Sequence, residues 1–288
     1  MIRKVFTQSL LYFVASYTPM LANLFLLPII NQYLNPEDYA IFGLTFSYIG
    51  LLQGFSDLGL IQQFQDTFFK EPDQYKAHWG RFLGFLRVYR PIYALAVAAL
   101  LFILFRNHIA ASEMAWYLIL VTVPVAFFDS TKGIAMRHCQ FRQDHRRVYI
   151  GTLLSGIITV TLTYFLIVHG GFTYMAWFIS AFVARLAEFI YYGYYLQFVA
   201  GIRASRHWTW PDMKVRIRQS LPLVPKKYAN YLVSTSDRAV LDFYRGRYNY
   251  PSMGDIGLYN VAYNFANYFG NFQGAVTTVM SPILYKLF

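Results

Sequence analysis

The sequence predicts an all-α polytopic membrane protein, and three features support this fold class. Hydrophobic residues make up 57% of the 288 residues, and only 14% are charged, whereas a soluble domain has about 25% charged residues. The mean hydropathy is +0.35. Apolar runs of about 20 residues recur along the chain, and this is the length that a helix needs to cross a bilayer. Such uninterrupted runs fit helices better than the strands of a barrel.

Eight apolar runs predict about eight transmembrane helices. The first run follows Arg3 and Lys4, as the apolar part of a signal peptide would, but it is too long and leads through a turn at 35–38 into the next run. We therefore expect an uncleaved first helix. The approximate limits are 8–34, 39–65, 82–105, 114–135, 148–168, 172–199, 219–244 and 256–282.

Basic residues in alternate loops predict the orientation. One set of loops contains only Arg106, Arg245 and Arg247, and nearly all other loop Lys and Arg residues fall in the opposite set. The positive-inside rule makes the basic set cytoplasmic, so we expect both termini in the cytoplasm. The longest cytoplasmic loops are 66–81, 136–147 and 200–218. The single cysteine, Cys139, falls in the second of them and is expected to be accessible from the cytoplasm.

Several classes of function are excluded by composition and motifs. The net charge of +11 could attract phosphate, but it is spread over short loops and no nucleic-acid-binding module frames it, so we expect no nucleic-acid partner. One cysteine permits no internal disulfide and no cysteine-based metal site. Without a nucleotide-binding, zinc or hydrolase motif, we expect no enzyme, no catalytic residue, no metal and no cofactor.

The basic segment 201–218 predicts the boundary between two lobes. It contains an aromatic cluster at 208–210 and a helix start at Pro211. Residues 1–200 would form an N-terminal lobe of six helices, and residues 219–288 would form the first two helices of a second, incomplete lobe.

The second unit begins like the first. Residues 219–221 repeat the Gln-Ser-Leu of 8–10, and 255–259 open the eighth run much as 38–42 open the second. A unit of six helices returns the chain to its starting side, so a second copy would run parallel to the first. Parallel repeats are a known plan of transporters.

Ordered motifs at the two lobe openings point to a known family. The first opening contains Leu27-Pro28, 33–39 and 57–60, and the second contains 220–225, 236–238, Gly246 and 256–263. Across nearly its whole length the chain resembles the polysaccharide-transporter (Wzx-type) lipid-linked oligosaccharide flippases of the MOP superfamily. Members of that family have two complete lobes, so the resemblance implies a truncated member.

The resemblance implies a multi-pass protein of the bacterial cytoplasmic (inner) membrane. Its activity would be translocation of an isoprenoid-pyrophosphate-linked oligosaccharide by alternating access, for assembly of O-antigen, capsule or exopolysaccharide. The implied partners are that lipid-linked oligosaccharide, membrane lipids and polysaccharide polymerase machinery. Two alternatives stay open. One is another MOP-type antiporter, which would need a negatively charged cavity for cationic drugs, and the other is a non-transporting fragment.

The run at 219–244 carries the strongest functional signal, because ionisable residues interrupt it. A charge at bilayer depth costs at least about 2.5 kcal/mol, so such residues face protein or a watery cavity. We expect Arg238 to bind the pyrophosphate through its planar fork, with Lys226 and Lys227 as further substrate-binding residues. Alternatively, Arg238 and Asp242 neutralise each other and the lysines snorkel.

A stripe of amides in the next run predicts contacts with sugars. Asn260, Asn264, Asn267 and Asn271 recur at helical spacing, and Tyr259 and Tyr263 lie among them. Amides in a bilayer also bond helices to each other, at about 0.6–2 kcal/mol each. Both interpretations stay open.

Three aspartates are candidates for binding a coupling ion: Asp57, Asp237 and Asp242. Asp57 has no close opposite charge in its own run, so pairing with a distant lysine or arginine is the alternative that we favour.

Other charged residues have simpler explanations. The pairs Asp129 with Lys132 and Arg185 with Glu188 lie three residues apart and are expected to neutralise each other within their helices. Arg87 and Arg90 are expected near the cytoplasmic end of the third span, where they would snorkel to lipid headgroups or receive a substrate phosphate.

Overall fold

The computed structural model describes residues 22, 25–142 and 144–267, and these residues are helical with no β-strand among them. Four helices in this part are long and apolar enough to cross a membrane: Tyr75–Phe105, Ala111–Phe141, Arg146–Val168 and Met175–Ala200. The predicted all-α polytopic membrane fold is therefore confirmed.

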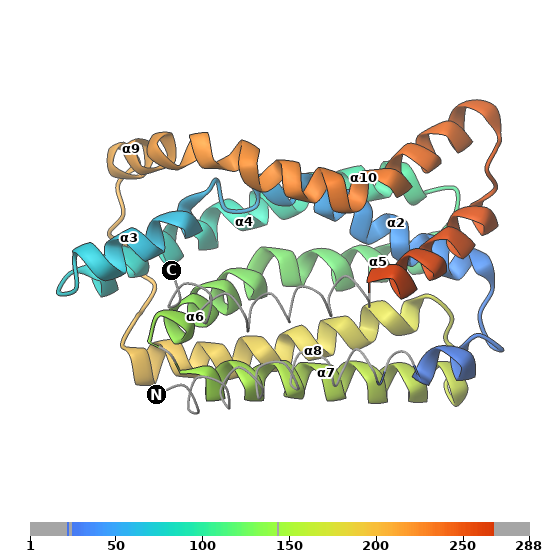
Figure 1. The fold of residues 1–288 in the computed structure, drawn as a ribbon, viewed down its shortest axis with the longest axis horizontal. Helices are drawn as coiled ribbons and strands as arrows, with labels where there is room; N and C mark the ends of the chain where they lie inside the picture. Colours follow the sequence, from blue (N-terminus) through green and yellow to red (C-terminus); the bar gives the residue numbers. More distant parts are fainter. Residues whose placement is uncertain (1–21, 23–24, 143, 268–288) are drawn as a thin grey trace, which may run out of the picture.

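The long helices run side by side in layers (Figure 1). Helices α7 (His145–Val168) and α8 (Met175–Tyr194, continued by the π-helical η4, Tyr195–Ala200) form one layer. Helix α5 (Ala111–Val123) continues through a π-helical segment, η3 (Pro124–Phe128), into α6 (Asp129–Phe141), which packs on α8. Helices α2 (Pro36–Leu52) and α4 (Tyr75–Phe105) lie beyond them.

The part of the chain that follows η4 packs over α2 through α10 (Val224–Tyr248). Helix α9 (Trp210–Ser220) begins with Pro211 in its first turn, which confirms the predicted helix start. A short turn, η5 (Leu221–Leu223), joins it to α10, which packs along α2. The chain then turns back into a helix that is described over residues 253–267.

Apolar side chains lie both inside the bundle and on its surface. Tyr117 and Leu101 are fully buried in one core cluster and Trp79 and Phe82 in another. On the outside, Ile92 is 63% exposed and Ile190 is 62% exposed. An apolar exterior of this extent is typical of helices that face lipid.

The predicted second span, 39–65, is wrong in its second half. Helix α2 ends at Leu52, the short turns η1 (Gln53–Phe55) and η2 (Leu60–Gln62) follow, and a separate helix α3 runs over Gln63–Lys70. Leu58 and Gly59 have φ values of +51° and +76°, which no helix accommodates. Asp57 stabilises this turn because its Oδ1 accepts the Gly59 N–H at 3.1 Å.

Cys139 does not lie in a loop. Helix α6 continues to Phe141, and the thiol is fully buried in the cluster around Trp79. The fourth apolar run was expected to end near residue 135 because polar residues begin there, but tertiary packing extends the helix. The expectation of an accessible cysteine is therefore wrong.

The two helix starts that the sequence pairs are capped in the same way. The Asp38 carboxylate accepts the Asn35 N–H at 2.8 Å at the start of α2. The Asp255 carboxylate accepts the Ser252 N–H at 2.9 Å at the start of the helix at 253–267. This is the return hydrogen bond of a capping box, and the internal repeat itself stays a prediction.

Candidate functional site

Helix α10 approaches α2 closely because α2 offers small residues. A Cβ at Gly50 would lie 3.0 Å from Thr235 Cγ2. Just beyond the end of α2, a Cβ at Gly54 would lie 3.0 Å from Tyr228 Cδ2. Ser47 Oγ also donates a hydrogen bond to the Thr235 carbonyl. Small residues that bring helix backbones together are typical of membrane helix pairs.

Asp242 is neutralised on this interface by neighbours other than Arg238. One carboxylate oxygen accepts the Tyr48 hydroxyl at 2.6 Å, and the other lies 2.8 Å from Arg245 Nη2 and 2.9 Å from Arg245 Nε. The alternative in which Arg238 neutralises Asp242 is therefore wrong, because Arg245, three residues further along α10, offers two donors.

Arg238 lies in a separate cluster with Asp237, Tyr259 and Tyr263, which we call the α10 charge cluster. The Arg238 side chain is buried, and its Cζ lies 4.1 Å from the centre of the Tyr263 ring. Its Nε is 3.9 Å from Asp237 Oδ1 and has no hydrogen-bond partner in the described part of the chain. Asp237 Oδ2 accepts the Tyr259 hydroxyl at 2.6 Å. The cluster therefore holds a desolvated guanidinium against an aromatic ring.

Asn260 links the last described helix to α2. Its side chain is 1% exposed, and Nδ2 donates to the Tyr39 carbonyl at 3.1 Å. Gly43 makes room for it, since a Cβ at that position would overlap the Asn260 amide. This geometry favours the packing interpretation for Asn260. Asn264 is half-buried and Asn267 is exposed, so these two amides face a more open side.

A family model described as polysaccharide biosynthesis protein matches residues 5–288 of the chain. The chain belongs to this family. It is the family of Wzx-type flippases of the MOP superfamily, so the resemblance is confirmed. No curated protein and no solved structure matches the chain.

Family membership gives the chain a role in polysaccharide transport or biosynthesis at a membrane. Three sequence-predicted residues lie wholly or partly beyond what the structure describes. Lys226 and Lys227 belong to the first turn of α10, but their side chains are outside the described part, and so is all of Asn271.

Asp57 lies away from the α10 charge cluster, at the turn between α2 and α3. It is 1% exposed, and its side chain accepts the Gly59 N–H. Asp57 and Arg90 both lie close enough to Tyr89 to interact with it electrostatically. None of these contacts tests whether Asp57 binds a coupling ion, so that role stays a prediction.

Arg90 is a buried cation, whereas the sequence predicted that it would lie near the cytoplasmic end of a span. Helix α4 begins at Tyr75 rather than near residue 82, so Arg90 lies midway along it and is 3% exposed. Its Nη1 donates to the Val125 carbonyl at 3.4 Å, in the π-helical segment η3. A proline and a π turn both free carbonyl groups inside a helix, and Pro124 within an apolar run was the available signal. Snorkelling of Arg90 is thus wrong.

The four charges of α6 and α8 pair between the helices rather than within them. Lys132 Nζ lies 2.6 Å and 2.8 Å from the two carboxylate oxygens of Glu188. Arg185 Nη1 lies 3.8 Å from Asp129 Oδ2. The expected pairs within each helix are wrong, because α6 and α8 pack directly against each other.

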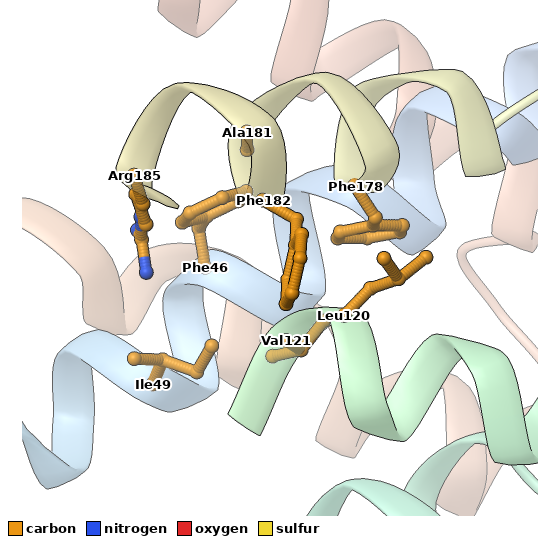
Figure 2. A pocket seen from close by; sticks show the side chains of 8 residues that line it. All are labelled: Phe46, Ile49, Leu120, Val121, Phe178, Ala181, Phe182 and Arg185. Carbon is orange, nitrogen blue, oxygen red and sulfur yellow. The ribbon is translucent and has the colours of Figure 1, made fainter. Parts of the chain in front are cut away.

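The space between α2, α5 and α8 is tightly filled by the described side chains. Figure 2 shows a hollow there, lined by apolar side chains such as Phe46, Val121 and Phe178, with Arg185 at one side. Its volume is about 10 Å³, which is about the space for one water molecule. A sugar does not fit in this hollow.

Proposed function

We propose that this chain translocates an isoprenoid-pyrophosphate-linked oligosaccharide across the bacterial cytoplasmic membrane by alternating access. The product would serve assembly of O-antigen, capsule or exopolysaccharide, and the chain would act as a transporter rather than an enzyme. Lipid-linked oligosaccharide, membrane lipids and polymerase machinery would be its partners, and both termini would be cytoplasmic. One observation carries this proposal beyond family membership: the buried Arg238 has an Nε–H that meets no acceptor among the residues that the structure describes.

A purely structural arginine at this depth should have its donors satisfied. Burying a charge costs several kcal/mol by order of magnitude unless hydrogen bonds compensate. The nearest described carboxylate oxygen, on Asp237, is 3.9 Å from Arg238 Nε, which is too far for a hydrogen bond. A pyrophosphate oxygen would supply the missing acceptor for the Nε–H, and the planar fork of arginine matches phosphate geometry. Stacking on Tyr263 orients that fork.

The residues around Arg238 suit the rest of such a substrate. Tyr259 reaches Asp237 from the helix at 253–267, and Asn264 and Asn267 offer amide groups further along that helix. Asp237 touches both Arg238 and Tyr259. Protonation of Asp237, or an ion bound there, would weaken its attraction for Arg238, so among the three aspartates it is the best placed to couple an ion to the substrate.

An antiporter for cationic drugs is less favoured by the same geometry. On α10 the described carboxylates Asp237 and Asp242 lie beside Arg238 and Arg245, respectively. The described face therefore has no excess of negative charge to attract a cation.

Substitution of Arg238 tests the proposal. We expect Arg238→Ala to lower transport about tenfold or more, since a hydrogen bond to a charged group contributes about 1.5–3 kcal/mol. Arg238→Lys should restore activity only in part, because an ammonium lacks the fork. Restoration of surface polysaccharide in a flippase-deficient strain, normalised to the amount of protein in the membrane, is the measurement.

Two comparisons separate the substrate role from a structural one. Arg247→Ala removes an exposed arginine near the end of the same helix and should leave transport unchanged. If Arg238 only balances Asp237, adding Asp237→Asn to Arg238→Ala should recover activity. That recovery, or full activity of Arg238→Ala alone, would refute the substrate role.

A further inference from the structure

A second cationic site lies on a different side of the molecule from the α10 charge cluster. A cavity of about 410 Å³ opens between α4, α6 and the α8–η4 helix. We call it the α4–α8 pocket. Its lining includes the polar residues Arg87, Thr131, Gln197 and Arg203. One water molecule needs about 10–15 Å³ on the same measure, so the pocket has room for a polar head group.

The charge of the α4–α8 pocket is not compensated. Arg87 and Arg203 both line it, and no acidic residue does. Neither arginine forms an ion pair with any residue that the structure describes. The nearby Lys132 is already neutralised by Glu188. Two arginines that line one cavity without a carboxylate suit a phosphate-bearing ligand.

The position of Arg203 is built into the fold. The segment after η4 lies directly on α4, where Gly80 and Gly84 are one turn apart. The Ser205 N–H donates to the Gly80 carbonyl at 2.9 Å. A Cβ at Gly84 would overlap the Ser205 carbonyl oxygen. The two glycines therefore allow this segment, which contains Arg203, to lie against α4. Arg87 belongs to the same helix.

The pocket is bordered by side chains that suit lipid. Ile190 and Tyr194, on its α8 side, are 62% and 64% exposed, and Val88 and Ile92 expose apolar surface on α4. Helices α4 and α8 are both long and apolar enough to span a membrane. A charged cavity beside such a surface would meet a head group at the interface, while acyl chains cover the apolar side chains.

We propose that the α4–α8 pocket binds the phosphate head group of an anionic phospholipid through Arg87 and Arg203. Arg203 follows η4 in a segment that the distribution of basic residues places in the cytoplasm. Basic pockets between membrane helices on this side bind anionic head groups. The site uses no residue of the α10 charge cluster, so it does not depend on the transport proposal.

Native mass spectrometry of the purified protein with added phosphatidylglycerol tests this proposal. We expect bound phosphatidylglycerol in the parent protein, and about tenfold weaker binding for each of Arg87→Gln and Arg203→Gln, the loss of one charge-assisted hydrogen bond. Arg146→Gln removes an exposed arginine outside the pocket and should bind like the parent. The melting temperature of each variant in detergent verifies that it is folded.

Three results would overturn the proposal. One is binding of phosphatidylcholine as tight as that of phosphatidylglycerol. Another is equal loss in Arg146→Gln, which would indicate a general charge effect. The third is preferential binding of another phosphate-bearing ligand at these arginines, either inorganic phosphate alone or an isoprenoid pyrophosphate, which would assign the site to that ligand.

Discussion

At the residue scale, the contact between Gly43 and Asn260 determines how closely the helix at 253–267 approaches α2. The Asn260 amide occupies the space that a Cβ at Gly43 would take, and it donates to the Tyr39 carbonyl one turn earlier. Glycine in a helix interior costs about 1 kcal/mol relative to alanine. Here that cost is offset by a hydrogen bond between two helices.

We therefore expect Gly43→Ala to lower stability by about 1–3 kcal/mol, the usual cost of overpacking a close contact. The measurement is the melting temperature in detergent. Gly133→Ala on α6 is the matched control, because a Cβ there meets only Ile61 Cδ1, at 3.6 Å; it should be neutral or slightly stabilising. Asn260→Ala should partly rescue Gly43→Ala. Equal melting temperatures for the two glycine variants would contradict this account.

Individual side chains at the site were predictable only in part. The sequence identified Arg238, Asp237 and Asp242 because charges inside an apolar run are costly wherever they point. Their partners were not predictable, since Tyr48 reaches Asp242 from a helix almost two hundred positions away in the chain. Arg90 was misplaced for a related reason: its burial depends on the carbonyl of Val125 in another helix.

At the scale of elements, α6 and α8 are joined by two ion pairs of unequal burial. Glu188 is 3% exposed and receives both of its described bonds from Lys132, whereas Asp129 and Arg185 are more open to solvent. Removing one partner of a buried pair leaves an uncompensated charge. Removing one partner of the Lys132–Glu188 pair should consequently cost more stability than removing one partner of the Asp129–Arg185 pair.

Lys132→Ala is expected to destabilise the protein by about 1–3 kcal/mol, because it leaves the buried Glu188 carboxylate without its donor while Lys132 itself is partly exposed, and adding Glu188→Gln should recover most of that loss. Thermal unfolding in detergent is the measurement. Lys70→Ala provides a control, because its pair with Asp66 is largely exposed and should contribute about 0.5 kcal/mol or less. Rescue of Lys132→Ala by Asp129→Asn instead of Glu188→Gln would show that the pairs form within the helices after all.

The apolar runs located most helices, but not where they end. Runs at 148–168 and 172–199 lie close to α7 and to the α8–η4 helix, since an apolar face of that length has few alternatives to a membrane helix. The run at 39–65 concealed a break, because Leu58 and Leu60 keep the hydropathy high through a turn that Asp57 and Gly59 form. Hydropathy reports the preference of side chains for an apolar environment and not the backbone conformation.

At the scale of the whole molecule, the alternation of basic loops predicts which ends of the helices face the cytoplasm. Cys139 is buried, so its labelling cannot report the orientation. For the same reason the parent chain should not react with a thiol reagent, and an introduced cysteine can be detected against it. Asp73 lies exposed between α3 and α4, and Asn107 lies exposed between α4 and α5. These two positions are at opposite ends of α4.

Cysteine labelling at these positions tests the orientation. We expect Asn107→Cys to react with a membrane-impermeant maleimide in intact cells, and Asp73→Cys to react only after permeabilisation, because the basic loops stay inside. The parent chain should remain unlabelled in both conditions. The reverse pattern, or equal labelling of both variants in intact cells, would overturn the predicted topology.

The most direct test of the transport proposal follows a fluorescent isoprenoid-pyrophosphate oligosaccharide between leaflets in proteoliposomes. An impermeant glycosidase outside the vesicles digests only substrate in the outer leaflet. With the parent chain we predict that digestion proceeds past the outer-leaflet fraction toward completion, and that Arg238→Ala slows this second phase about tenfold or more. A second phase no faster than in protein-free liposomes would contradict the proposal that this chain moves the substrate.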